Sequence, residues 1–328
     1  MNDNKHGFKA YNPGLICRGY QYEEGKTYKK NGHGVCVGGV THYCVNPFDV
    51  LDYYPLVRED GKFSEFTTVE AIDEPVTNDN RKFATSTIKI GVKLGFAGFI
   101  KACIDFVYEK TIKNMPSDKV DTGNSAQIGS SGYSAQIGSS GNAAQIGSSG
   151  NAAKIGSSGY SAQIGSSGDS AQIGSSGNAA KIGSSGNAAK IGSSGDSAQI
   201  GSSGDSAQIG SSGYSAQIGS SGNNAKIGSS GYSAKIGSSG NSAQIGSSGD
   251  SAKIDISGNA SVGAAIGINS IIKGAVGNWI TLAEWAYDSD KQRCAPVCVK
   301  SAQIDGQIIK ADTWYKLTDG EFVEVADE

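Results

Sequence analysis

The sequence predicts a mainly β protein, in which a parallel β-solenoid of nonapeptide repeats, two per coil, is capped by an N-terminal α+β domain and a small C-terminal β domain. Three observations support this prediction. Fifteen consecutive nonapeptides of the form N-S-A-Q-I-G-S-S-G run from Asn124 to Gly258, sequence of globular composition precedes them, and a short β-prone segment follows them. We therefore expect three domains, at residues 1–118, 124–258 and 259–328.

Each nonapeptide is predicted to form one short strand and one turn. Isoleucine occupies the fifth place of every unit, with Ala two places before it and Gln or Lys between them. This alternation is typical of a half-buried strand, whereas S-S-G followed by Asn, Asp or Tyr is typical of a turn. We expect the turn glycines to adopt positive φ angles and the invariant serines to form hydroxyl ladders between coils.

Two nonapeptides are needed to close one flattened coil of 18 residues, because nine residues cannot enclose their own side chains. Fifteen units then give seven and a half coils, and the degenerate segment 259–267 is expected to complete the eighth. At about 4.8 Å per coil, such a rod would be roughly 38 Å long. A flexible Gly/Ser-rich linker is the alternative, but a linker has no need of an isoleucine in phase in every unit.

A coil of 18 residues sorts the variable turn residues onto two edges of the rod. One edge carries Tyr160, Tyr214 and Tyr232 together with Asp196 and Asp250, and the other carries Tyr133, Asp169 and Asp205. The lysines divide between opposite faces, with Lys154, Lys190 and Lys226 on one and Lys181, Lys235 and Lys253 on the other. Rigid exposed aromatic residues are favoured at interfaces, so the first edge is the predicted interaction surface. The alternative is a solvated turn position that tolerates many residue types.

The flanking segments predict ordinary short elements. In the N-terminal domain we expect strands within 14–29, 34–44, 64–73 and 82–94, a short helix with Asn46 as N-cap and Pro47 at its first position, and an amphipathic helix over 95–110. In the C-terminal domain we expect short strands joined by Asp-Gly turns at 305–306 and 319–320.

Catalytic motifs are missing from the sequence, which predicts no enzyme and no cofactor. It contains no P-loop, G-x-G-x-x-G, H-E-x-x-H or G-x-S-x-G element. The three histidines lie near the N-terminus, so acid–base chemistry would depend on His42 with Cys36, Cys44 or the acidic pair Asp49 and Asp52. The repeat also differs from the calcium β-roll, because Ser, Ala or Asn stands where that motif places its liganding Asp.

The six cysteines are interpreted as reduced thiols rather than as a disulfide framework. Zinc binding by Cys36, His42 and Cys44 is the alternative, although their spacing contains no C-x-x-C pair, and we predict no metal site. Cys294 and Cys298 are expected to be loop or core thiols, and a disulfide between them across a Pro-containing turn under oxidising conditions is the alternative.

Charge and hydropathy favour a cytoplasmic protein. The formal net charge of −3 argues against direct DNA binding, and the sequence has neither an apolar run of membrane-spanning length nor an apparent export signal.

Several stretches, CRGYQYEEGKTYKKNG, HYCVNPFDVLDYY and TSTIKIGVKLGFAGFIKACIDFVYEK, resemble an uncharacterised domain family of phage and prophage proteins. Related chains carry S-A-Q-I-G-S-S-G tracts and a tail similar to GNWITLAEW. The resemblance implies a phage-encoded protein made in the bacterial cytoplasm, and it supplies no catalytic residues.

Three functions are consistent with the sequence. The favoured one is a non-enzymatic phage protein whose rigid solenoid binds and inhibits a host complex of antiviral defence or nucleic-acid handling. The second is a virion or assembly component that uses the rod as a spacer or oligomerisation element. The third is an enzyme or ligand-binding module in the N-terminal domain, with the solenoid as its stalk.

Overall fold

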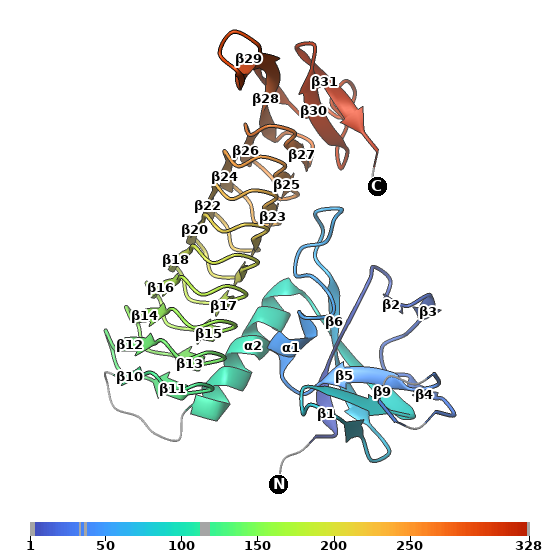
Figure 1. Ribbon diagram of the computed structural model, residues 1–328. Coiled ribbons are helices and arrows are strands. Elements are labelled where there is room, and N and C mark those ends of the chain that lie inside the picture. Colours follow the sequence, from blue (N-terminus) through green and yellow to red (C-terminus); the bar gives the residue numbers. More distant parts are fainter. Residues whose placement is uncertain (1–3, 33, 36–37, 112–118, 327–328) are drawn as a thin grey trace. The chain divides into compact units, whose positions relative to one another are not determined.

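The computed structural model describes residues 4–32, 34–35, 38–111 and 119–326 of the chain (Figure 1). The chain divides into two compact units. The first comprises Met1–Leu56 and Phe63–Phe106, and the second comprises Val57–Lys62 and Val107–Glu328. No helix among the described residues has the length and apolar character needed to cross a membrane.

The first unit is built on a seven-stranded sheet with the order β4-β9-β6-β1-β5-β8-β7, and a small hairpin, β2-β3, lies outside it. The elements are β1 (His6–Tyr11), β2 (Ile16–Cys17), β3 (Tyr20–Gln21), β4 (Thr27–Lys29), β5 (Thr41–Cys44), α1 (Pro47–Val50), β6 (Glu65–Ala71), β7 (Val76–Thr77), β8 (Lys82–Thr85), β9 (Thr87–Leu94) and α2 (Phe96–Thr111). All pairings in this sheet are antiparallel.

The central strand of this sheet, β1, was not among the expected elements. It pairs with β6 over its whole length and with β5 on its other side. Its sequence, HGFKAY, lacks the usual apolar alternation because Lys9 occupies a buried position and Gly7 faces a close backbone neighbour. A Cβ atom at Gly7 would lie 2.5 Å from the carbonyl oxygen of Cys44, so this position requires glycine.

Both helices of this region follow the sequence prediction. The Asn46 side chain accepts a hydrogen bond of 3.0 Å from the Phe48 N–H, and Pro47 begins α1. On α2, Phe99 is buried and stacks on Phe66 of β6 with 3.6 Å between ring centroids. The first unit nevertheless contains little helix, and its core is mainly that of a sheet.

The second unit is the predicted parallel β-solenoid, which Figure 1 shows as successive rungs. Strands of even number form one sheet, here called sheet D: β10 (Lys119–Asp121), β12 (Gln136–Ser139), β14 (Lys154–Ser157), β16 (Gln172–Ser175), β18 (Lys190–Ser193), β20 (Gln208–Ser211), β22 (Lys226–Ser229), β24 (Gln244–Ser247), β26 (Val262–Ala265) and β28 (Trp279–Asp288). Strands of odd number form sheet E: β11 (Gln127–Ser130), β13 (Gln145–Ser148), β15 (Gln163–Ser166), β17 (Lys181–Ser184), β19 (Gln199–Ser202), β21 (Gln217–Ser220), β23 (Lys235–Ser238), β25 (Lys253–Ile256) and β27 (Ile271–Gly274).

The register of the ladders confirms two repeats per coil. Each isoleucine pairs with the one 18 residues later, as in Ile164 with Ile182 and Ile191 with Ile209. The segment expected to complete the eighth coil does so as β26. The parallel ladders are longer than expected, however, at about nine coils, because β10 precedes the first full repeat and β27 and β28 continue the two sheets.

The solenoid interior is filled by three residues of each repeat. The Ala at the third place, the Ile at the fifth and the Ser at the seventh are buried in coil after coil, for example Ala180, Ile182 and Ser184. Only the last repeat, which has Ile256 at its seventh place, departs from this pattern. The expected serine hydroxyl ladders do not form in the middle coils, where the buried hydroxyls of Ser166, Ser184 and Ser202 have no hydrogen-bond partner. Coils are about 4.8 Å apart, which is too long for a direct hydroxyl–hydroxyl bond.

The turns reach a positive φ at a different residue from the one expected. It is the second residue of each unit, Ser, Ala or Asn, that is left-handed, as in Ser170 at 57° and Ala179 at 56°. No glycine of the fifteen units has a positive φ among the described residues. The glycine that ends each unit is required by close packing instead, since a Cβ at Gly186 would lie 2.0 Å from the carbonyl oxygen of Gly168.

Antiparallel hairpins end both parallel ladders. In sheet D, β29 (Arg293–Gln303) pairs with β28, and in sheet E, β30 (Trp314–Thr318) pairs with β27 and with β31 (Glu321–Val325). The expected Asp-Gly turns are present, with positive φ at Gly306, Asp319 and Gly320. Cys294 and Cys298 are free thiols, but they lie within the strand β29 rather than in a loop or a Pro-containing turn.

Candidate functional site

The two edges of the solenoid are held by a ladder of side-chain to backbone hydrogen bonds. Where the first residue of a repeat is Asn or Asp, its Oδ1 accepts from the backbone N–H of the residue 18 positions later. Examples are Asn187 with the Asp205 N–H at 2.9 Å and Asp205 with the Asn223 N–H at 2.7 Å. A tyrosine at this position cannot accept in this way. The ladder is therefore a structural reason for Asn and Asp, and each Tyr is an exception to it.

The register places the five residues of the predicted interaction surface on one edge of the rod, here called the Tyr edge: Tyr160, Tyr214, Tyr232, Asp196 and Asp250. Of its three tyrosine rings, Tyr214 and Tyr232 stack on each other, with ring centroids 4.7 Å apart and an angle of 19° between the ring planes. Their exposed fractions are 53% and 44%, and Tyr160, three coils away, is also exposed. Both carboxylates belong to the ladder, since Asp196 accepts from the Tyr214 N–H and Asp250 from the Ile268 N–H.

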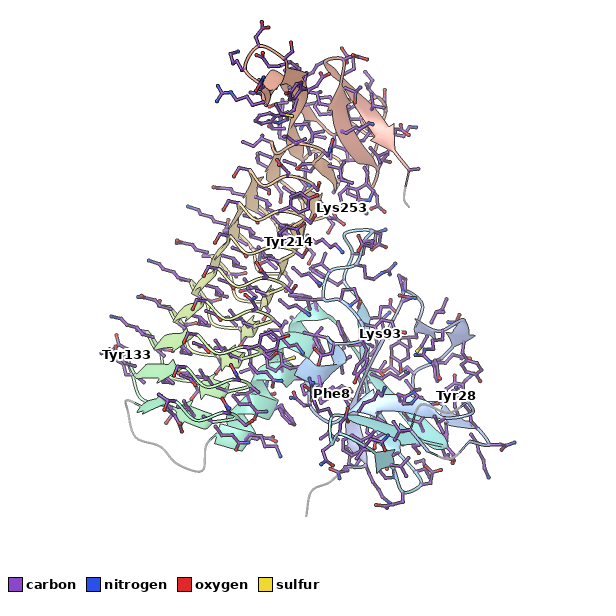
Figure 2. All side chains as sticks on the ribbon, viewed as in Figure 1. Phe8, Tyr28, Lys93, Tyr133, Tyr214 and Lys253 are labelled. Carbon is purple, nitrogen blue, oxygen red and sulfur yellow. The ribbon has the colours of Figure 1, made fainter. Side chains whose placement is uncertain are left out.

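The opposite edge offers a comparison. It carries Tyr133, which is 80% exposed and has no neighbouring tyrosine on its edge. Figure 2 labels Tyr133 and Tyr214 on the solenoid. Tyr214 and Tyr232 thus form a stacked and half-exposed pair, whereas Tyr133 is a single, mostly exposed turn residue.

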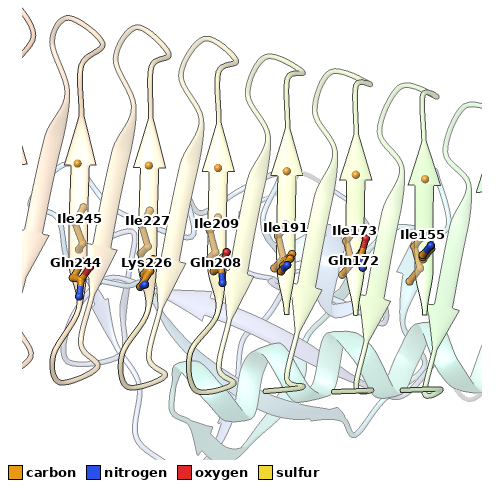
Figure 3. A pocket seen from close by; sticks show the side chains of 18 of the residues that line it. Ile155, Gln172, Ile173, Ile191, Gln208, Ile209, Lys226, Ile227, Gln244 and Ile245 are labelled. Carbon is orange, nitrogen blue, oxygen red and sulfur yellow. The ribbon is translucent and has the colours of Figure 1, made fainter. Parts of the chain in front are cut away.

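The outer face of sheet D is a shallow groove that runs along the rod (Figure 3). Its walls and floor come from the fourth and sixth places of the repeats. The fourth place alternates strictly between Gln and Lys from β12 to β24, so that Lys154, Lys190 and Lys226 stand two coils apart. The sixth place is glycine, and a Cβ at Gly174, Gly192 or Gly210 would meet nothing within 4 Å. This face is flat, polar and sparsely cationic.

The first unit contains a separate cavity of about 560 Å³. It is bordered by β1, the β2-β3 hairpin, β5 and the segment after α1. His42 and Cys44, two of the residues singled out from the sequence, line it together with Cys17. Burial, followed by the charges of Lys82, Lys9, Arg18 and Lys30, lowers the pKa of His42 to about 4, so its ring is neutral at physiological pH.

Two alternatives for the chemistry of this region are acid–base chemistry with Asp49 and Asp52, and metal binding. Asp49 and Asp52, the acidic pair considered with His42, both form ion pairs with Arg81, at 2.9 Å in the case of Asp49. Among the described residues no three His, Cys, Asp or Glu side chains are grouped closely enough to hold a metal ion. Cys36, the third residue of the zinc alternative, lies outside the described residues.

Residues 5–102 match the family described as Domain of unknown function (DUF7666). This match covers the strands of the first unit and the cavity, and it ends within α2. Comparisons with curated proteins and with solved structures gave no significant match. The N-terminal domain is thus similar to an uncharacterised domain family.

Sequence reasoning missed four cationic residues of the cavity, Lys9, Arg18, Lys30 and Lys82. Lys9 and Lys82 are 73 positions apart in the sequence, and antiparallel pairing of β1, β5 and β8 brings their strands together. Arg18 lies between β2 and β3, and Lys30 follows β4. The one local indication of the cavity in the sequence was Lys9, a charged residue at a position of a short strand where an apolar residue is usual.

Proposed function

We propose that this chain is a non-enzymatic interaction protein whose solenoid binds a host protein complex through the Tyr edge. In this proposal the protein is phage-encoded, acts in the bacterial cytoplasm and inhibits a complex of antiviral defence or nucleic-acid handling. The observation that carries the proposal is the stacked pair Tyr214 and Tyr232, about half exposed in turns that backbone hydrogen bonds join to the neighbouring coils.

The physical reason lies in the low entropic cost of binding through such a surface. Turn residues in a free loop would lose backbone freedom on binding, whereas the turns of Tyr214 and Tyr232 are already bonded to the coils on either side, as in Ser197 N–H to Tyr214 O at 2.7 Å. Two stacked rings supply a large apolar area, and the carboxylates of Asp196 and Asp250 flank them with negative charge. A partner would thus present an apolar or cationic surface to this edge.

The test is capture of a partner from a lysate of phage-susceptible bacteria, followed by reconstitution with the purified partner. The double variant Tyr214→Ser/Tyr232→Ser is expected to weaken binding by at least about thirtyfold, as for truncation of interface hot spots. Serine is a turn-compatible replacement, and Tyr133→Ser on the opposite edge is the matched control, which should bind as the parent does.

A third variant tests whether the outer face of sheet D binds the partner. In the variant Lys154→Gln/Lys190→Gln/Lys226→Gln, each lysine is replaced by the residue that already stands in the neighbouring coils. Equal binding by the parent and the tyrosine double variant would refute the role of the Tyr edge. Loss of binding only in the lysine variant would assign the interface to sheet D, and recovery of phage structural proteins alone would favour the virion-component alternative.

A further inference from the structure

The cavity of the first unit has an unusual balance of charge. Four of its lining residues are cationic, five are tyrosines, and none of its described lining residues is Asp or Glu. The cations are Lys9, Arg18, Lys30 and Lys82, and the tyrosines are Tyr20, Tyr22, Tyr43, Tyr53 and Tyr54. Like charges gathered in one concave site repel each other, and an anion that enters the site would reduce this repulsion.

Lys9 is the strongest single indication. Its side chain is buried, with the residue 7% exposed, and no carboxylate of the described residues forms an ion pair with it. The ammonium group donates to the sulfur of Cys17 at 3.4 Å and to the carbonyl oxygen of His42 at 3.2 Å. A buried ammonium group is costly without a counter-ion, and an ammonium group has three N–H donors, of which these contacts use two.

Two further lysines of the cavity are held against tyrosine rings. Lys30 lies with its ammonium nitrogen 5.0 Å from the centre of the Tyr20 ring and 3.2 Å from the Tyr22 hydroxyl. Lys82 lies 5.1 Å from the centre of the Tyr53 ring. A cation–π contact positions an ammonium group without neutralising its charge, so the charge of Lys30 is still available to a ligand.

Two lysines of β9, in the same sheet, are instead paired with acids. The Nζ of Lys89 in β9 lies 3.9 Å from Oε2 of Glu70, and the Nζ of Lys93 lies 2.7 Å from Oε1 of Glu65. Within the cavity, Lys9, Arg18 and Lys30 form no ion pair with any described residue. Three cations without an acidic partner among the described residues thus line one cavity, which is consistent with the lowered pKa of His42.

We propose that this cavity binds a phosphate-bearing small molecule of about nucleotide size, with Lys9, Arg18 and Lys30 contacting the phosphate oxygens. The volume of about 560 Å³ lies within the range of small-molecule sites. Phosphate oxygens accept several charge-assisted hydrogen bonds at once, which suits cations arranged around one space. The tyrosine rings offer apolar surfaces for the rest of the ligand. Because the site lies within residues 5–102, it is independent of the interaction proposed for the solenoid.

The experiment is calorimetric titration of the full-length protein at low ionic strength with pyrophosphate, with ADP and with adenosine as the uncharged control. We expect pyrophosphate and ADP to bind and adenosine not to bind. Tighter binding of ADP than of pyrophosphate would show a nucleotide source of the phosphate, and equal binding would show a site for inorganic phosphates; both support the proposal.

The variants Lys9→Met and Lys30→Gln are each expected to weaken pyrophosphate binding by about tenfold or more. Methionine keeps an unbranched apolar chain at the buried position, and Lys30→Gln changes a half-buried side chain, so it tests the site even if Lys9→Met fails to fold. The matched control is Lys89→Gln, a lysine of the same sheet outside the cavity lining. Absence of pyrophosphate and ADP binding at millimolar concentration, or equal binding by all variants, would overturn the proposal.

Discussion

At the residue scale, the two glycines of one repeat, at its sixth and ninth places, lie in different surroundings. The glycine at the ninth place faces the backbone of the preceding coil, and a Cβ at Gly186 would lie 2.0 Å from a carbonyl oxygen. The glycine at the sixth place of sheet D faces open space, as at Gly192. The first is therefore required by the distance between coils, whereas no neighbouring atom requires glycine at the second.

This difference predicts that the same substitution, Gly to Ala, lowers the free energy of unfolding strongly at one place and hardly at the other. Gly186→Ala should lower the free energy of unfolding by about 3 kcal/mol or more, because the methyl group forces adjacent coils apart. Gly192→Ala should change it by less than about 0.5 kcal/mol. Urea unfolding followed by tryptophan fluorescence measures the free energy of unfolding of both variants. All three tryptophans lie at the C-terminal end of the solenoid, so their fluorescence reports on its unfolding. Similar losses in the two variants would contradict the close-packing explanation.

His42 supplies a pH-dependent prediction for the first unit. Its pKa is lowered from 6.5 to about 4 in the folded state, first by burial and then by the four cations of the cavity. Between these two values the unfolded chain binds a proton that the folded chain does not. The free energy of unfolding should therefore fall as the pH decreases from 6.5 towards 4, by at most about 1.4 kcal/mol per pH unit and by less because the ring is partly solvated.

Ring-proton NMR would measure the pKa of His42, and urea unfolding followed by tyrosine near-UV circular dichroism would measure the slope. The variant His42→Gln should abolish that part of the pH dependence and leave the free energy of unfolding above pH 7 nearly unchanged. A His42 pKa close to 6.5, or the same slope in the variant, would show that the cations do not act on this ring.

At the scale of the element, the solenoid could be predicted because its pattern is local. An isoleucine in every ninth position, flanked by alternating residues, specifies a strand, and closing a coil requires two strands, so the 18-residue register and the two edges follow. The ladder formed by residues such as Asn187 and Asp205 explains the Asn and Asp of the variable place. The left-handed turn residue could not be predicted, because Ser170 and Ala179 adopt it without the usual glycine.

The elements of the first unit were harder to predict because their identity depends on distant partners. β1 is a strand because β5 and β6 pair with it on both sides, and its sequence contains a buried lysine that the apolar alternation of a strand does not allow. The cavity has the same origin. Its cations come from separate strands and loops, so no spacing along the sequence indicates that Lys9 and Lys82 line one space.

At the scale of the whole molecule, one repeat is half a coil, so the number of repeats between two residues decides whether they share an edge. Two repeats separate Tyr214 from Tyr232, which places their rings in adjacent coils of the Tyr edge. Removing two repeats elsewhere would shorten the rod by one coil and preserve every edge. Removing one repeat would also leave a continuous solenoid, but it would move all later residues to the opposite edge.

Deletion of 223–231, the repeat between the two tyrosines' coils, should therefore separate them, whereas deletion of the two repeats 178–195 should not. The readout is a disulfide in the variant Tyr214→Cys/Tyr232→Cys, because positions in adjacent coils lie about 4.8 Å apart, within the range that a disulfide spans. Under mild oxidation, peptide mapping should find this disulfide in the full-length chain and in the 178–195 deletion, and not in the 223–231 deletion. Far-UV circular dichroism should show a β-rich fold in all three. A disulfide in the 223–231 deletion would mean that a single repeat can form a complete coil, and the two-repeat coil on which the Tyr edge depends would then be wrong.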